Sequence, residues 1–94
     1  MSINETFKAL SDENRRKILD LLKNGDLTAG DIAKHFEMSK PGVSQHLSIL
    51  KNAELVYAIK KGQYVYYSLN STVFQDVLKW IIQFNSTTKG EDLC

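Results

Sequence analysis

Two helix-start signals only eleven positions apart constrain this chain more than any other feature. Thr28 and Asp31 match a capping box, in which a hydroxyl and a carboxylate three residues later each accept a backbone N–H of the other residue. Ser39 supplies a second N-cap, and Pro41 follows in the first turn, where its missing N–H costs nothing. The signals predict a short helix over residues 28–36, a two-residue turn, and a longer helix over residues 39–53.

Apolar spacing and caps predict two helices before this pair. Ile3, Phe7 and Leu10 recur at the spacing of one helix face and predict a first short helix. Asp12 is a suitable N-cap for a second helix, and Gly25 is a suitable residue to end it.

After residue 53 the pattern changes from helical to extended. Two β-rich runs, residues 56–59 and 64–69, flank Lys60-Lys61-Gly62-Gln63, which is typical of a β-hairpin. Asn70 is placed to cap a last helix over residues 71–84, and the polar residues 85–94 are expected to form a flexible tail. The predicted fold is one mainly α (α+β) domain over residues 1–94, in the order α-α-α-α-β-β-α.

Composition excludes several classes of protein. Hydrophobic residues make up 43% of the 94 residues and charged residues 24%, which is ordinary for a soluble domain. No apolar run approaches the roughly 18 residues that span a bilayer, and the N-terminus lacks the order of a signal peptide. The single cysteine, Cys94, excludes a disulfide framework and a cysteine metal cluster. We therefore expect a cytoplasmic protein without a cofactor and without membrane insertion.

Catalysis is not expected either. Ser44 and His46 are two residues apart on a predicted helix, so they lie about 200° apart around its axis and face away from each other. No Gly-rich phosphate loop, H-E-x-x-H motif or pair of carboxylates suited to a catalytic pocket is present.

Charge is distributed unevenly although the formal net charge is only +1. Residues 38–66 contain four basic residues, Lys40, Lys51, Lys60 and Lys61, and one acidic residue, Glu54. This excess indicates either a surface that faces phosphates or an ordinary solvated face.

The predicted short helix, turn and longer helix have the dimensions of a helix-turn-helix, and the hairpin with Lys60 and Lys61 at its tip is typical of a wing. The residues on the exposed side of the longer helix are small and polar, as a helix that enters the major groove requires. These features favour binding to double-stranded DNA. A dimeric module that only contacts other proteins is the alternative.

Three segments resemble the ArsR/SmtB family of winged-helix bacterial repressors: ALSDENRRKILDLL (residues 9–22), SKPGVSQHLSILK (residues 39–51) and GQYVYYSL (residues 62–69). The resemblance spans about residues 3–84. It implies a winged helix-turn-helix repressor that dimerises through its first and last helices, places its fourth helix in the major groove, and releases its operator on a signal.

The resemblance also assigns site residues. Gln45 and Lys40 stand where the family's recognition helix meets DNA. The amide of Gln45 suits adenine, and the ammonium of Lys40 suits guanine acceptors or a phosphate. Ser39 and Thr28 fit both capping and phosphate contact, and His46 fits both DNA contact and packing. The predicted DNA-binding residues are Thr28, Ser39, Lys40, Gly42, Ser44, Gln45, His46, Lys60, Lys61 and Gln63. Arg15 and Arg16 fit phosphate contact or, as we favour, pairing with Asp12, Glu13 and Asp20.

The last helix carries more apolar residues than one buried stripe needs. A second copy of the chain is the simplest cover for the surplus. The predicted dimer residues are Ile3, Phe7, Val77, Trp80, Ile81 and Phe84.

Departures from the family concern the signal. Thr28 and Gly30 occupy the positions of a Cys-x-Cys metal site found in many members, and the last helix offers Asp76 alone as a ligand. A tetrahedral zinc site needs about four ligands, so no metal site is predicted. The chain resembles the ligand-poor members, some of which are autorepressors controlled by a protein antagonist.

Overall fold

N-terminal caps define the starts of three helices in the computed structural model, which describes residues 3–86. Helix α2 (Glu13–Leu22) follows Asp12, whose carboxylate accepts the N–H of Arg15 at 3.1 Å. Helix α3 (Ala29–Ala33) follows Thr28, which forms the predicted capping box. Helix α4 (Lys40–Asn52) follows Ser39, whose Oγ accepts the N–H of Gly42 at 3.3 Å. The predicted cap of each of these helices is therefore confirmed.

The remaining elements are α1 (Ile3–Leu10), the strands β1 (Leu27–Thr28), β2 (Val56–Lys61) and β3 (Tyr64–Leu69), and α5 (Ser71–Ser86). Strands β2 and β3 form the predicted hairpin, and Gly62 in its turn has φ +63°, a value that glycine adopts without strain. The described chain follows the winged-helix architecture. The predicted order lacked one element, the strand β1. This strand pairs with β3 and makes an antiparallel sheet of order β1-β3-β2.

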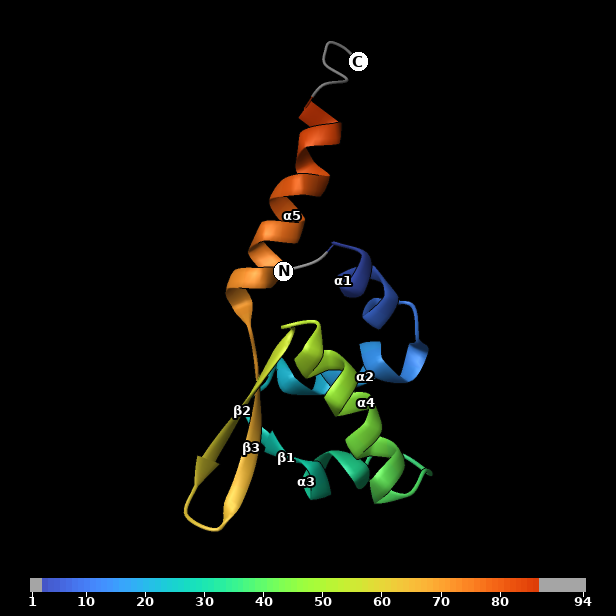
Figure 1. The fold of residues 1–94 in the computed structure, drawn as a ribbon, viewed down its shortest axis with the longest axis vertical. Coiled ribbons are helices and arrows are strands. Elements are labelled where there is room, and N and C mark those ends of the chain that lie inside the picture. The colour runs from blue at the N-terminus through green and yellow to red at the C-terminus, as the bar shows by residue number, and fades with distance from the viewer. Residues whose placement is uncertain (1–2, 87–94) are drawn as a thin grey trace.

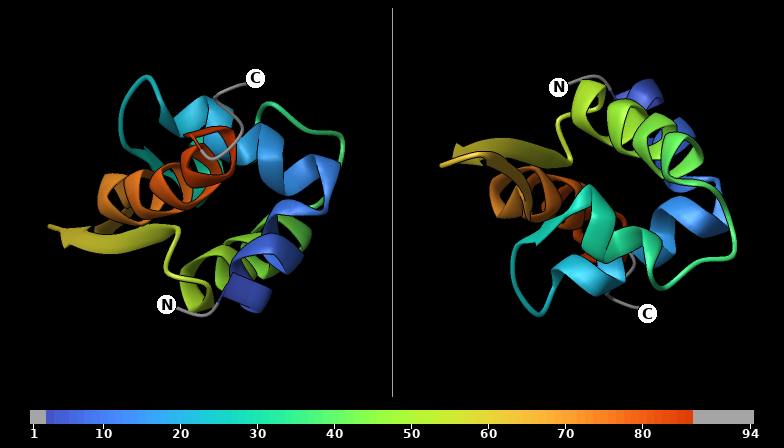
Figure 2. Two further views of the ribbon diagram at one scale, coloured as in Figure 1. Left: turned by 90° about the horizontal axis from the view of Figure 1, so that it is seen from above. Right: turned by 90° about the horizontal axis from the view of Figure 1, so that it is seen from below.

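The elements are arranged between two ends of an elongated molecule (Figure 1). The hairpin tip, α3 and the start of α4 lie at the lower end, and the right view of Figure 2 shows this end face on. Helices α1 and α5 lie toward the upper end, where α5 extends beyond the rest of the fold. No helix in residues 3–86 is long and apolar enough to cross a membrane.

Side chains from α2, α3 and α4 form the centre of the core. Ile18, Ile32, Val43, Leu47 and Leu50 are fully buried there. Helix α1 faces this core with Thr6 and Ala9, whereas Phe7 remains 39% exposed. Phe7, which the sequence predicts at the dimer interface, therefore lies outside the buried core of the subunit.

The ends of α3 and α5 and the role of Asn70 differ from the predictions, and β2 continues to Lys61, two residues beyond its predicted run. Helix α3 ends at Ala33, because His35 and Phe36 donate to carbonyls three residues back in a tighter turn. The Asn70 amide donates to the Glu54 carbonyl at 2.9 Å and accepts the Tyr57 hydroxyl at 3.0 Å. It thereby joins the end of α4 to the base of the hairpin. Helix α5 continues through Ser86, and residues 87–94, most of the predicted tail, lie outside the described residues.

Candidate nucleic-acid interface

A hollow of about 310 Å³ opens between the start of α3, the start of α4 and the hairpin. Thr28 and Gly30 line it from the α3 side, Lys40 from α4, and Gln63 and Tyr64 from the hairpin. The fold thus brings three predicted interface residues, Thr28, Lys40 and Gln63, from separate segments to one place. Its lining includes the hydroxyl of Thr28, the amide of Gln63 and the ammonium of Lys40, groups that suit an anionic group such as a phosphate.

Helix α4 presents a polar face to solvent beside this hollow. Its buried side is the stripe Val43, Leu47 and Leu50. Lys40, Ser44, Gln45 and Ser48 are exposed. An exposed helix face with an amide, hydroxyls and an ammonium provides the groups that read base edges in the major groove.

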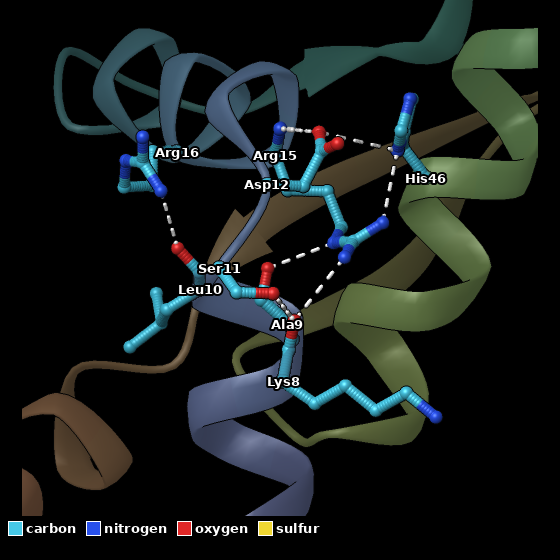
Figure 3. Close-up of polar contacts among 8 residues, drawn as sticks. All are labelled: Lys8, Ala9, Leu10, Ser11, Asp12, Arg15, Arg16 and His46. Atoms are coloured by element: carbon cyan, nitrogen blue, oxygen red, sulfur yellow. Dashed lines mark hydrogen bonds and ion pairs between the residues drawn. The ribbon is translucent and has the colours of Figure 1, made fainter.

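His46 does not share this exposed face. Its side chain is only 20% exposed and lies against the start of α2 (Figure 3). Nδ1 lies 3.3 Å from an Arg15 guanidinium nitrogen and 3.9 Å from the Asp12 carboxylate. Of the two roles that the sequence left open for His46, packing within the protein is the one that these contacts describe.

The capping box at Thr28 fixes the start of α3 and the charge beside it. Thr28 Oγ1 accepts the Asp31 N–H at 3.1 Å, and the Thr28 N–H donates to the Asp31 carboxylate at 3.3 Å. Hydrogen bonds from the hydroxyl and then the N–H of Thr28 hold the pKa of Asp31 below its ordinary value. Thr28 is therefore a cap first, and a phosphate contact would add to that role.

The two hairpin lysines point to opposite faces of the sheet. Lys60 pairs with Val65 and Lys61 with Tyr64, so alternation places Lys60 on the side of the buried Val56. Lys61 lies on the other side, where its Nζ is 5.6 Å from the centre of the Tyr66 ring. Both are exposed at the end of β2 that adjoins the turn.

Gly42 has no steric need within the protein to be glycine. A Cβ there would meet the nearest protein atoms, in the Met38 and Ser39 side chains, at 3.5 and 3.6 Å, which are ordinary contacts.

We expect Gly42→Ala to leave the fold intact and to stabilise it by about 0.5–1 kcal/mol through helix propensity. If α4 lies close to DNA here, the same variant binds its duplex more weakly. Thermal unfolding and duplex titration together check this, and unchanged affinity would contradict close approach at Gly42.

Arg15 and Arg16 donate to carbonyls of helix α1, and within residues 3–86 neither forms the predicted ion pair with Asp12, Glu13 or Asp20, although the charge of Arg15 acts on Asp12. Arg15 Nε donates to the Ala9 carbonyl at 2.8 Å, and a terminal nitrogen donates to the Lys8 carbonyl at 3.2 Å. Arg16 donates to the Leu10 carbonyl at 2.7 Å. These carbonyls belong to the last residues of α1, where the regular helical hydrogen bonds end, and sequence periodicity does not reveal that the arginines bind them. Asp20 pairs with Lys23 instead, at 3.4 Å.

An exposed apolar surface covers α1 and α5 at the other end of the molecule. The Phe7 and Trp80 rings lie 5.8 Å apart, and Phe84 meets Trp80 edge to face at 5.0 Å. Leu78, Ile81 and Ile82 add exposed aliphatic area, and Trp80 itself is 41% exposed. Val77 is 8% exposed, so it belongs mainly to the subunit's own interior.

Within residues 3–86, no group of three or more His, Cys, Asp or Glu side chains lies close enough to share a metal ion. Thr28 and Gly30 lie at the start of α3, and Asp76 lies on α5. Cys94 is outside the described residues.

Comparison with known proteins gives one consistent result. The family model described as "Bacterial regulatory protein, arsR family" matches residues 12–58. Transcriptional repressor SdpR of Bacillus subtilis is 61% identical over 96% of this chain and 98% of its own length. The arsenical resistance operon repressor of Staphylococcus aureus is 37% identical over 88% of this chain and 80% of its own. An ArsR-like transcriptional regulator from Rhodococcus sp. RHA1 has a TM-score of 0.81 at 26% identity, covering 89% of this chain and 79% of that one.

Proposed function

This chain belongs to the arsR family of bacterial regulatory proteins, so it is a DNA-binding transcriptional regulator, and we propose that it is a repressor that acts as a homodimer on an inverted-repeat operator. The observation that carries the proposal is the gathering of three features at one end of the fold. These are the exposed polar face of α4, the hollow beside it and the basic end of the hairpin.

The proposed division of labour follows from where each group lies. Gln45 and Ser44 on the exposed face of α4 read bases, and the Gln45 amide matches the donor and acceptor pair of adenine. Phosphate contacts supply affinity without sequence information. The full proposed DNA-binding set is Thr28, Ser39, Lys40, Gly42, Ser44, Gln45, His46, Lys60, Lys61 and Gln63. His46 contributes mainly by packing against the start of α2, which holds α4 in place.

The proposed dimer forms through the apolar surface of α1 and α5, with Ile3, Phe7, Val77, Trp80, Ile81 and Phe84 at or beside it. Six large apolar side chains of these two helices, those of Phe7, Leu78, Trp80, Ile81, Ile82 and Phe84, are more than one third exposed, and such exposed apolar surface often marks a protein–protein interface. A two-fold dimer presents two α4 helices, so the operator carries two half-sites centred about 10 bp, or a multiple of that, apart.

We propose further that the signal is not a metal ion held at the positions used by metal-sensing members. Thr28 Oγ1 is occupied by the capping box, and Gly30 offers no side chain. A protein antagonist is the proposed source of the signal, and the protein's own promoter is a proposed target.

Lys61→Ala is expected to weaken binding to specific and random duplexes alike, because the lysine contacts phosphate and not base edges. Each lost phosphate contact reduces the slope of log affinity against log salt by about 0.9, so a dimer that loses one contact in each subunit loses about 1.8. Salt titrations on both kinds of duplex measure the effect. Lys51 is an exposed lysine at the other end of α4, so Lys51→Ala is the matched control. This variant is expected to leave the slope of log affinity against log salt unchanged.

Selection of bound duplexes from fragments of the source genome tests the proposed function. The expected result is recovery of promoter fragments that share an inverted repeat, among them the promoter of the protein's own gene. No enrichment over random fragments at low salt would refute DNA binding and favour a dimeric protein-interaction module.

A further inference from the structure

One side chain, that of Arg15, connects three helices (Figure 3). It projects from the first turn of α2, and two of its nitrogens donate to the Lys8 and Ala9 carbonyls at the end of α1. A third nitrogen lies 3.3 Å from Nδ1 of His46 on α4. Nδ1 accepts this hydrogen bond in the neutral tautomer that carries its proton on Nε2.

The end of α1 is well suited to such a link. The last carbonyls of a helix carry the negative end of its dipole, so a guanidinium both donates to them and neutralises them. The Lys8 carbonyl also accepts the Ser11 N–H at 3.2 Å and the Ser11 hydroxyl at 2.6 Å, whereas Arg15 supplies the described donor to the Ala9 carbonyl. Arg15 also lines a hollow of about 250 Å³ that Lys8 and Ala9 border from α1 and Ile49 and Asn52 border from α4. Packing therefore leaves a gap between α1 and α4 along this stretch, and Arg15 connects the two helices by hydrogen bonds.

Two groups at the start of α2, the Arg15 guanidinium and the Asp12 carboxylate, lie near the same His46 atom, Nδ1. The Asp12 carboxylate, which accepts the N–H of Arg15, lies 3.9 Å from His46 Nδ1. The N–H donation from Arg15, followed by the nearby positive charge of its guanidinium, keeps the pKa of Asp12 below its ordinary value. His46 directly follows Gln45, so whatever fixes the ring also fixes the stretch of α4 that carries the exposed amide.

We propose that Arg15 is a positioning residue for operator recognition: it sets the placement of α4 relative to α1, and so the separation of the two α4 helices in the dimer. The inference rests on the dimeric DNA-binding function proposed above. In a dimer joined through α1 and α5, the two α4 helices do not touch each other. Their separation depends on how each α4 is placed relative to α1 and α5 of its own subunit. A bond from α1 to α4 then acts directly on half-site spacing.

The first test needs no DNA. Ser48, exposed on α4, is replaced by cysteine in a Cys94→Ser background and carries a nitroxide label, and pulsed electron resonance measures the distance between the two labels of the dimer. The parent is expected to give one narrow distance distribution. Arg15→Gln, and His46→Leu, which removes the acceptor, are expected to broaden or shift it.

Arg16→Gln is the matched control, because Arg16 also donates to the end of α1, at Leu10, and its described hydrogen bond does not reach α4. We expect this variant to retain the narrow distribution, and Arg15→Lys, which keeps the charge and some donors, to be intermediate. An unchanged distribution in Arg15→Gln, at a temperature where circular dichroism shows it folded, would overturn the inference. Absence of any distance between subunits would overturn the dimer and the inference together.

The second test uses the duplexes recovered by the genomic selection, with the half-site spacing changed by one base pair. The parent and Arg16→Gln are expected to bind the altered duplexes at least about tenfold more weakly, because both half-sites must be engaged at once. Arg15→Gln is expected to lose most of this discrimination. A merely structural role would lower affinity for all spacings equally. If the parent binds no duplex, the proposed function fails while the label distances still decide the role of Arg15.

Discussion

Replacing Ile81 by Glu is expected to convert the dimer to a monomer and to abolish operator binding at concentrations where the parent is saturated. Ile81 is 47% exposed within the subunit and lies on the apolar side of α5, so the fold does not depend on it. In the dimer the substitution buries two uncompensated carboxylates. Each such burial costs several kcal/mol, so the dissociation constant rises by at least about a hundredfold.

Gln83→Glu is the matched control for this variant. It adds the same charge two positions further along α5, about 200° around the helix and on its polar side. Sedimentation shows the oligomeric state of both variants. Trp80, the single tryptophan, lies in the predicted interface, so its fluorescence emission reports dissociation on dilution. An Ile81→Glu variant that remains a dimer at micromolar concentration would contradict the proposed interface.

Gln45→Ala has the second large expected effect, and it is specific to sequence. If the amide forms paired hydrogen bonds with adenine, its removal costs about 1–3 kcal/mol on the preferred operator and relaxes choice at one base-pair position in each half-site. Gln45 is exposed on the side of α4 away from Val43 and Leu47, so the stability of the fold is unaffected.

Competition binding with operators substituted at each position measures this change. Asn52→Ala removes an exposed amide from the other end of α4 and is expected to leave the preference unchanged. If Gln45→Ala retained the parent's preference at every position, α4 would not read sequence through this side chain, and Ser44 or Lys40 would be the next residue to substitute.

Local sequence signals predicted the frame of this interface. The caps at Thr28 and Ser39 depend on bonds within three residues, so the spacing of the two helices follows from the sequence. The hairpin turn likewise depends on Gly62 and its neighbours. Together these signals place α3, α4 and the hairpin in order, which is most of the winged-helix fold.

Features that depend on distant segments were not predicted. Strand β1 has two residues and exists because Leu27 and Thr28 pair with β3, far along the chain. The Asn70 amide binds the Glu54 carbonyl sixteen residues away. Arg15 and Arg16 bind carbonyls only six residues away, but across the turn between α1 and α2, whose geometry the apolar spacing does not show. The contact of Phe7 with Trp80 of α5 also joins distant segments, and the helical spacing of Ile3, Phe7 and Leu10 does not reveal it.

Binding of one selected duplex with both half-sites intact, compared with the same duplex with one half-site scrambled, tests the central claim most directly. We predict two chains on the intact duplex, a large loss of affinity on the scrambled one, and log affinity that falls linearly with log salt on both. Equal affinity for the intact and scrambled duplexes would contradict the claim that this chain reads an inverted repeat as a dimer.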